Sequence, residues 1–273
     1  MATVPGSQFS VTAVGAFGAI SGDANLAVLV GSNANAPAVA AGSPVLSPSG
    51  LELDLIGGAF AVTDNGSGND TALGSSGPDT ITVFDNFDSV SGGSGNDTIS
   101  VTGMNDTVTV SSGNDLINVT NSSDVINGGS GSDTITALAS FDTINGGSGT
   151  DSISVTGTFD LIRTGIGSDT VNVTGSNDTV MSGASAGPGQ NALINLTGGN
   201  MTIVDGPNTY SDTVVGFDQS AGDAIQLTGT DTSVYAVAHQ TPENGGQDTL
   251  ITLNDGSTIL LKGVSHIDST FFS

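Results

Sequence analysis

The sequence predicts an all-β fold, a parallel β-roll or β-solenoid with 18-residue coils, and three observations predict it. Aspartate recurs every nine residues from Asp70 to Asp178, and an apolar residue follows each of these aspartates two positions later. Glycine-rich turns recur every eighteen residues in the same stretch. Such a repeat indicates a solenoid, because a short coil buries its apolar face only when neighbouring coils stack on it.

The nine-residue ladder separates into two ladders of period eighteen, which implies two short strands and two unlike turns in each coil. One set of aspartates has glycine two residues before it, namely Asp79, Asp97, Asp115, Asp133, Asp151 and Asp169. The aspartates between them follow turns without that glycine, and three of these turns carry Phe87, Phe141 or Phe159. Because side chains alternate along a strand, apolar residues such as Ile81 and Val83 are expected to point into a narrow core.

The charge balance limits the partners. Only Arg163 and Lys262 are basic, against 27 acidic residues, and the formal net charge is −25. Nucleic acid and anionic membranes need a cationic protein surface, so neither is an expected partner. No apolar run approaches the ~18 residues of a transmembrane helix, and no Sec-type signal pattern opens the chain. The chain has no cysteine, so neither disulfides nor thiolate chemistry is expected.

A cation is the expected partner, because stacking brings like charges together. Coils lie roughly 4.8 Å apart, and two carboxylates about 4 Å apart repel by ~1 kcal/mol in water and ~4 kcal/mol at a dielectric of 20. Calcium takes carboxylate and carbonyl oxygens together, so six glycine-backed turns imply about five inter-turn ions. The predicted calcium ligands are Asp79, Gly93, Gly95, Asp97, Gly113, Asp115, Gly129, Gly131, Asp133, Gly147, Gly149, Asp151, Gly167 and Asp169.

Turns such as Gly92-Gly93-Ser94-Gly95-Asn96-Asp97 resemble the RTX, or haemolysin-type, nonapeptide repeat, Gly-Gly-x-Gly-x-Asp-x-aliphatic-x. The resemblance covers roughly residues 65–182. It implies a parallel β-roll with calcium between the glycine-rich turns, type I secretion from a bacterium, and folding outside the cell where calcium is millimolar. The turns before Asp115 and Asp169 each lack a glycine of the motif, so we expect weaker sites there. At the phenylalanine-bearing turns we expect few or no ions, and aspartates that cap or hydrogen-bond the turn.

Three regions are expected along the chain. Residues 1–64 are interpreted as an N-terminal cap or an assembly arm, with strands over 9–14 and 51–55. Residues 65–182 form the predicted calcium β-roll. Residues 183–273 are interpreted as a C-terminal β capping and type I secretion-signal region. In that region two strands, 248–253 and 257–261, flank Asn254-Asp255-Gly256, which is a hairpin signal.

The sequence favours a structural protein over an enzyme. His239 and His266 are the only histidines, and they lack zinc-type spacing. His239 is interpreted as a surface loop residue, and the regularly spaced carboxylates as calcium ligands. We therefore expect a calcium-dependent structural protein that forms a homo-oligomer or polymer outside the cell, as an S-layer, fibre or matrix component.

The alternative is a calcium-stabilised module that binds ice or a cell-surface glycan. Its support is a ladder of outward threonine and serine at eighteen-residue spacing, for example Thr80 followed by Thr98. Leu116 and Asn118 interrupt this ladder, and threonine is also simply a good strand residue. Both alternatives remain open from the sequence.

Overall fold

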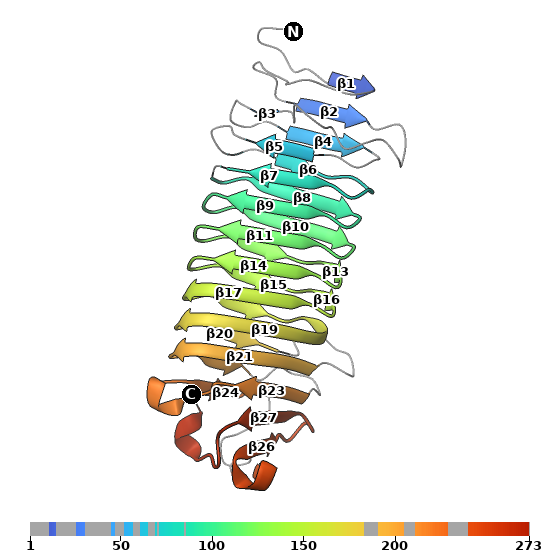
Figure 1. The fold of residues 1–273 in the computed structure, drawn as a ribbon. Helices are drawn as coiled ribbons and strands as arrows, with labels where there is room; N and C mark the ends of the chain where they lie inside the picture. The colour runs from blue at the N-terminus through green and yellow to red at the C-terminus, as the bar shows by residue number, and fades with distance from the viewer. Residues whose placement is uncertain are drawn as a thin grey trace. The chain divides into compact units, whose positions relative to one another are not determined.

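The fold is all-β in a computed structural model that describes residues 69, 71–84, 86–182, 191–204, 211–228 and 240–272, and the backbone of five strands between residues 11 and 64 (Figure 1). The described strands form a parallel β-solenoid with coils of about eighteen residues, which confirms the predicted fold class. The chain comprises two compact units, Met1–Thr136 and Ala137–Ser273. Asp70 and His239 lie outside the described residues.

The first unit is built from parallel strands, each paired with the strand one coil further along the chain. These strands are β1 (Val11–Val14), β2 (Leu26–Val30), β3 (Val45–Leu46), β4 (Glu52–Ile56), β5 (Ala61–Asp64), β6 (Thr71–Leu73), β7 (Thr80–Val83), β8 (Ser89–Ser94), β9 (Thr98–Thr102), β10 (Thr107–Ser112), β11 (Leu116–Thr120), β12 (Val125–Asn127), β13 (Ser130–Gly131) and the start of β14 (Thr134–Leu138). One face pairs β6, β8 and β10, and the other pairs β7, β9 and β11. In both faces the partners lie eighteen residues apart, as the repeat predicts, except at an irregularity where Val110 lies opposite Gly93.

The second unit has the same architecture. Its elements are β15 (Thr143–Asn145), β16 (Ser148–Gly149), β17 (Ser152–Thr158), β18 (Leu161–Arg163), β19 (Ile166–Ser176), β20 (Thr179–Met181), β21 (Asn191–Gly199), β22 (Thr202–Val204), β23 (Ser211–Val215), η1 (Gln219–Ala221), β24 (Ala224–Gln226), β25 (Gln240–Glu243), η2 (Asn244–Gly246), β26 (Asp248–Thr252), β27 (Thr258–Lys262) and η3 (Ser269–Phe271). One face pairs β15, β18, β20, β22 and β24 in order, and the other pairs β17, β19, β21, β23 and β27.

The core consists of aliphatic side chains stacked in register. In the first unit Ile81, Ile99 and Ile117 lie opposite one another and are fully buried. Ile144 and Ile162 do the same in the second unit. These are the residues two positions after each aspartate. Burying such a side chain contributes roughly 1.5–3 kcal/mol, and the β-branched isoleucines also suit a pleated strand.

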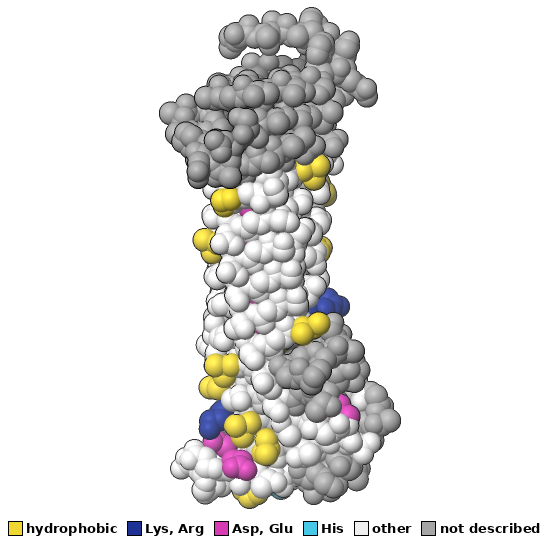
Figure 2. Space-filling model, turned by 90° about the vertical axis from the view of Figure 1, so that its right-hand side faces the viewer, with side chains coloured by type: hydrophobic (Ala, Val, Ile, Leu, Met, Phe, Trp, Pro, Cys, Tyr) yellow, Lys and Arg dark blue, Asp and Glu magenta, His cyan; other side chains and the backbone are white. Residues whose placement is uncertain are grey.

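The outer surface of the coils carries little charge. Every acidic residue described between residues 71 and 182 is buried. Figure 2 views the molecule from the side where Figure 1 places β13 and β16, and the coil surface there shows almost no acidic side chain. A chain with a formal charge of −25 therefore presents coils whose described surface is mainly serine, threonine, asparagine, glycine and backbone, with scattered apolar side chains.

The strands predicted in residues 1–64 are present at β1 and β4. β4 pairs in parallel with β6, and β5 pairs in parallel with β7, so these strands share the sheets of the coils that follow. The predicted roles of this region as cap or arm, and the predicted boundaries at 64 and 182, stay predictions.

The parallel stacking continues beyond residue 183, although the nine-residue spacing ends there. Asp169 lies opposite Ala192, so the coil between them is longer than eighteen residues. The coil strands then end at an antiparallel hairpin, β26–β27, with β25 added to its edge. This hairpin confirms the one predicted around Asn254-Asp255-Gly256. Its strand β27 pairs in parallel with β23, so the hairpin closes this face of the second unit.

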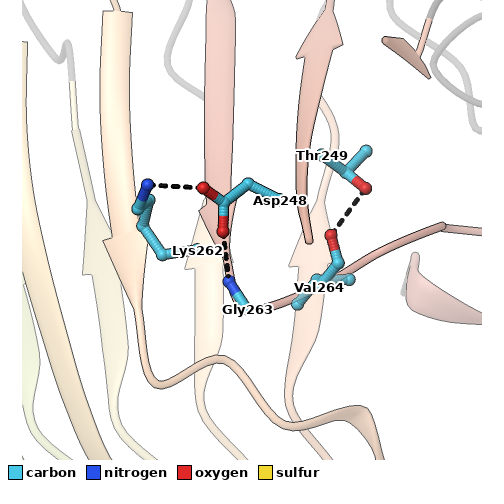
Figure 3. Close-up of polar contacts among 5 residues, drawn as sticks. All are labelled: Asp248, Thr249, Lys262, Gly263 and Val264. Carbon is cyan, nitrogen blue, oxygen red and sulfur yellow. Dashed lines mark hydrogen bonds and ion pairs between the residues drawn. The ribbon is translucent and has the colours of Figure 1, made fainter. Parts of the chain in front are cut away.

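An ion pair between a buried aspartate and a partly exposed lysine fixes the hairpin (Figure 3). Asp248 is buried on β26, and its carboxylate contacts the ammonium of Lys262 on β27 at 2.5 Å. The amide of Gly263 donates a second hydrogen bond to the carboxylate at 2.8 Å, and the Thr249 hydroxyl donates to the carbonyl of Val264. The Gly263 amide and the Lys262 ammonium hold the pKa of Asp248 below its ordinary value.

Candidate calcium sites

The glycine-rich turns have the backbone conformation that the sequence predicts. All eight glycines named as ligands have positive φ, namely Gly93, Gly95, Gly113, Gly129, Gly131, Gly147, Gly149 and Gly167. At Gly113 the φ is 145°, and a Cβ there would lie 1.5 Å from the carbonyl oxygen of Gly95 in the preceding coil. Only glycine fits such a position, because any side chain would collide with the backbone of the neighbouring turn.

Successive glycine-rich turns are hydrogen-bonded to one another through their backbones. The amide of Gly95 donates to the carbonyl of Ser112 at 2.8 Å, and the amide of Gly113 donates to the carbonyl of Ser130 at 2.9 Å. In the second unit the amide of Ile166 donates to the carbonyl of Gly147 at 2.7 Å. Each carbonyl oxygen has a second lone pair, so a turn stack offers oxygen ligands in addition to its hydrogen bonds.

All six glycine-backed aspartates are buried, and their carboxylates link successive coils. In the first unit the amide of Asp79 donates to Oδ1 of Asp97 at 2.8 Å, and the amide of Asp97 donates to Oδ1 of Asp115 at 2.7 Å. The amide of Asp115 donates in turn to Oδ1 of Asp133 at 2.8 Å. In the second unit the Asp151 amide donates to Oδ1 of Asp169 at 2.9 Å. The structure therefore joins these residues into ladders of hydrogen bonds within each unit.

The second carboxylate oxygen, Oδ2, is the feature that indicates a cation. In Asp97 and Asp115 this oxygen is buried and accepts no hydrogen bond. It lies on the turn side, since a Cβ built on Gly92 would be 2.6 Å from Oδ2 of Asp97. Burying an ionised carboxylate without full compensation is costly, so the site requires either a proton or a cation. Asp79 differs, because Ser75 donates both its amide and its hydroxyl to Oδ2 of Asp79.

Burial also raises the pKa of these carboxyl groups. Desolvation raises the pKa of Asp97 to about 7, with smaller contributions from the charges of Asp115 and Asp79. Desolvation likewise raises the pKa of Asp169 to about 6, and that of Asp115 above its ordinary value. Amide donors lower each pKa, but less than burial raises it. At neutral pH the negative charge of the ladder is therefore poorly compensated. A bound divalent cation would remove the free-energy cost of burying that charge.

The available ligands fit calcium. They are hard oxygens, buried carboxylates and turn carbonyls, which calcium prefers, and they lack the nitrogen and sulfur of a zinc site. Among the described residues no group of three or more acidic or histidine side chains gathers at one point. Each ion would therefore take its carboxylates from neighbouring coils and complete its coordination with carbonyl oxygens from the glycine-rich turns.

The second ladder has the same geometry, which the sequence did not indicate. The amide of Asp88 donates to Oδ1 of Asp106 at 2.8 Å, and the amide of Asp160 donates to Oδ1 of Asp178 at 2.9 Å. Burial raises the pKa of Asp160 to about 7, while the backbone amides of Asp142 and Phe141 donate to its carboxylate and lower that pKa by less. The predicted hydrogen-bonded turns are present here. The prediction that this ladder binds few or no ions stays a prediction.

In the turns of the second ladder, positive φ falls on a residue other than glycine. The residue before each aspartate has positive φ, and it is asparagine, serine or phenylalanine: Asn69, Phe87, Asn105, Ser123, Phe141, Phe159 and Asn177. The left-handed conformation costs an ordinary residue roughly 1–2 kcal/mol, and asparagine tolerates it best among non-glycine residues. Phenylalanine at three of these positions is therefore unexpected on backbone grounds.

Two further aspartates extend the ladders in the second unit, and they were not predicted as ligands. The amide of Ala192 donates to Oδ1 of Asp212 at 2.8 Å, and the amide of Met201 donates to Oδ1 of Asp223 at 2.9 Å. Both aspartates are buried. The signal in the sequence is the apolar residue two positions later, as at the regular coils, without the nine-residue spacing.

Comparison with known families identifies the coils. The family model for the RTX calcium-binding nonapeptide repeat matches four times, over residues 64–99, 100–135, 127–162 and 154–186. Residues 64–186 are RTX calcium-binding repeats. The resemblance stated from the sequence is thereby confirmed, and calcium is the cofactor of the RTX repeats.

The other comparisons add little. No curated protein matches the chain. Among solved structures, the extracellular lipase LipA from Serratia marcescens is similar at 14% identity and a TM-score of 0.35. The match covers 74% of this chain and 39% of the lipase chain, and a score this low supports no argument about fold or activity. Within the described residues, no helix has the length and apolar character needed to cross a membrane.

Proposed function

We propose that this protein is a secreted structural protein that folds when it binds calcium outside the cell and then self-assembles into an S-layer, fibre or biofilm matrix. The buried Oδ2 atoms of Asp97 and Asp115 carry the calcium part of this proposal. Their charge opposes folding until a cation compensates it. Where calcium is abundant, each bound ion contributes to stability, by about 2.7 kcal/mol at a concentration of 100 Kd.

The surface of the coils supports the self-assembly part. The ladder aspartates are buried, so the outer surface of the coils carries little acidic charge. Threonine, serine and asparagine cover the strand faces, and regular repeats of this kind offer the same contacts at every coil. Scaffold occupies nearly all of the described chain, which favours a structural role over a catalytic one.

Electron microscopy with and without millimolar calcium tests the proposal, together with light scattering. We expect filaments or sheets in calcium, and their loss when a chelator such as EGTA is added. Unordered monomers with EGTA and folded monomers with calcium would refute self-assembly while retaining calcium-dependent folding. A protein that is equally folded in both conditions would refute the role of calcium.

A second candidate function is binding to ice or to a surface glycan. It is favoured by the register of the outward polar residues, since Thr80 lies opposite Thr98 in the first unit and Ser152 lies opposite Thr170 in the second. This candidate predicts a calcium-loaded monomer that shapes ice crystals or is retained on a glycan array. If the monomer does neither, this candidate is excluded.

A further inference from the structure

One turn of the glycine-backed ladder compensates its aspartate without a cation. This turn, residues 74–79, joins β6 to β7 (Figure 1). Ser75 is buried there, and it donates its amide and its hydroxyl to Oδ2 of Asp79, at 2.6 Å and 3.0 Å. Two donors on one carboxylate oxygen stabilise its negative charge, as a bound cation would. Oδ2 of Asp79 is therefore hydrogen-bonded, whereas Oδ2 of Asp97 and of Asp115 is not.

The equivalent serine of a later coil does not make this contact. Ser111 occupies the same place before Asp115, two coils after Ser75. Ser111 is exposed, and the buried Oδ2 of Asp115 accepts no hydrogen bond. A serine at this place is therefore not sufficient to compensate the aspartate. The backbone of the turn decides whether the serine points inward.

The backbone of the turn before Asp79 differs from that of the later turns at Gly77. Gly95 and Gly113, at the same place in the next two turns, have φ of 135° and 145°, whereas Gly77 does not have positive φ. The amides of those two later glycines donate to carbonyls of the following coil, but the amide of Gly77 donates to the hydroxyl of Ser75 at 3.1 Å. The next residue, proline at 78, accounts for the difference, because proline favours an extended conformation in the residue before it.

The carbonyl oxygen of Gly77 also lies in a different place. A Cβ built on Gly113 or on Gly131 would lie 1.5 Å or 1.4 Å from the carbonyl oxygen of the glycine one coil before it. A Cβ built on Gly95 would lie 2.5 Å from the carbonyl oxygen of Gly77. Turn carbonyls are the ligands that would complete the coordination of a calcium ion. The turn before Asp79 therefore differs from the later turns in both kinds of ligand, carboxylate and carbonyl.

We infer that the turn before Asp79 binds no calcium, because Ser75 takes the place of the ion, and that the calcium ladder of the first unit begins at Asp97. This inference rests on calcium binding at the glycine-rich turns, which is part of the proposed function. It removes Asp79 from the ligands that the sequence predicts. Ser75 and Pro78 together then set the point along the chain at which calcium binding starts.

The test converts this turn into a copy of the next one. The double variant Ser75→Gly with Pro78→Asn gives the turn the sequence of residues 92–97. The matched control is Ser111→Gly, since Oδ2 of Asp115 accepts no hydrogen bond that this change could remove. Far-UV circular dichroism in calcium checks that each variant folds. Equilibrium dialysis, at a free calcium concentration that just saturates the wild type, counts the ions bound per chain. We expect the double variant to bind one ion more than the wild type, and the control to bind the wild-type number.

A second pair of variants keeps the test independent of the double change. Asp79→Asn and Asp97→Asn make the same change of charge and side chain in successive coils. We expect Asp79→Asn to bind the wild-type number of ions and Asp97→Asn to bind fewer. If the two asparagine variants bind equal numbers of ions, or if the folded double variant gains none, the inference is overturned while the proposed function stands. A wild type that binds no calcium overturns both.

Discussion

Replacing Asp97 with asparagine should have opposite effects with and without calcium. The asparagine Oδ1 still accepts the hydrogen bond from the Asp79 amide, so the link between the coils is kept. The substitution removes the charge of the buried Oδ2. Without calcium that charge opposes folding, and with calcium it binds the ion. We therefore expect Asp97→Asn to stabilise the calcium-free protein and to weaken calcium binding.

The magnitude follows from the pKa of Asp97. Burial raises it from 3.8 to about 7, and each pKa unit corresponds to about 1.4 kcal/mol, so ionisation costs the calcium-free fold at most about 4 kcal/mol. Water near the turn screens part of this cost, and the new amide donor of asparagine is itself buried, so we expect a gain of roughly 2 kcal/mol. With calcium, the loss of one charged ligand should raise the calcium midpoint of folding by about tenfold.

The raised pKa of Asp97 also fixes the direction in which stability changes with pH. Because the folded-state pKa of Asp97 lies above 3.8, the stability that this group contributes is present in full below about pH 4 and is lost as pH rises through about 7. Far-UV circular dichroism in EGTA should therefore show the wild type losing its fold as pH rises across that range. Asp97→Asn should keep its fold to higher pH. A variant that unfolds at lower pH than the wild type, or that needs no more calcium, would refute the reasoning.

Three other predictions concern single positions. Asp106→Asn, in the ladder without glycine-rich turns, should leave the calcium midpoint within about twofold of the wild type; a tenfold rise on titration would place an ion there. In a denaturant titration, Gly113→Ala should destabilise the calcium-loaded protein by roughly 2–4 kcal/mol through backbone strain and collision with Gly95. The control Gly256→Ala, whose Cβ would meet no neighbour, should cost about 1 kcal/mol in the same titration. Lys262→Met should lower the thermal midpoint of unfolding at neutral pH and have a smaller effect in acid. The Gly263 amide and Lys262 lower the pKa of Asp248, so this carboxylate loses its stabilising charge as pH falls below 3.8. Equal effects on the thermal midpoint at both pH values would contradict this.

The fold could be predicted because the repeat constrains every coil in the same way. The position of Ile81 relative to Asp79 fixes which side of the strand faces the core, and the glycines fix where each coil turns. The calcium sites could be predicted only as residue types. The hydrogen bond from one aspartate amide to the carboxylate in the next coil depends on how the coils stack. The spacing in the sequence therefore did not show that these carboxylates are buried and hydrogen-bonded rather than exposed on the surface. The coils around Asp212 escaped prediction because their lengths vary.

The antiparallel hairpin β26–β27 also has a consequence for the order of folding. Its strands are joined by a short turn, and its ion pair between Asp248 and Lys262 lies within the hairpin, so its contacts are local and require no metal. Contacts between coils join residues eighteen or more positions apart and close a larger loop, which is slower. A hairpin that forms first presents β27 as a ready partner for β23. The coils then have a template at their C-terminal end, and each new coil needs to match only the one before it.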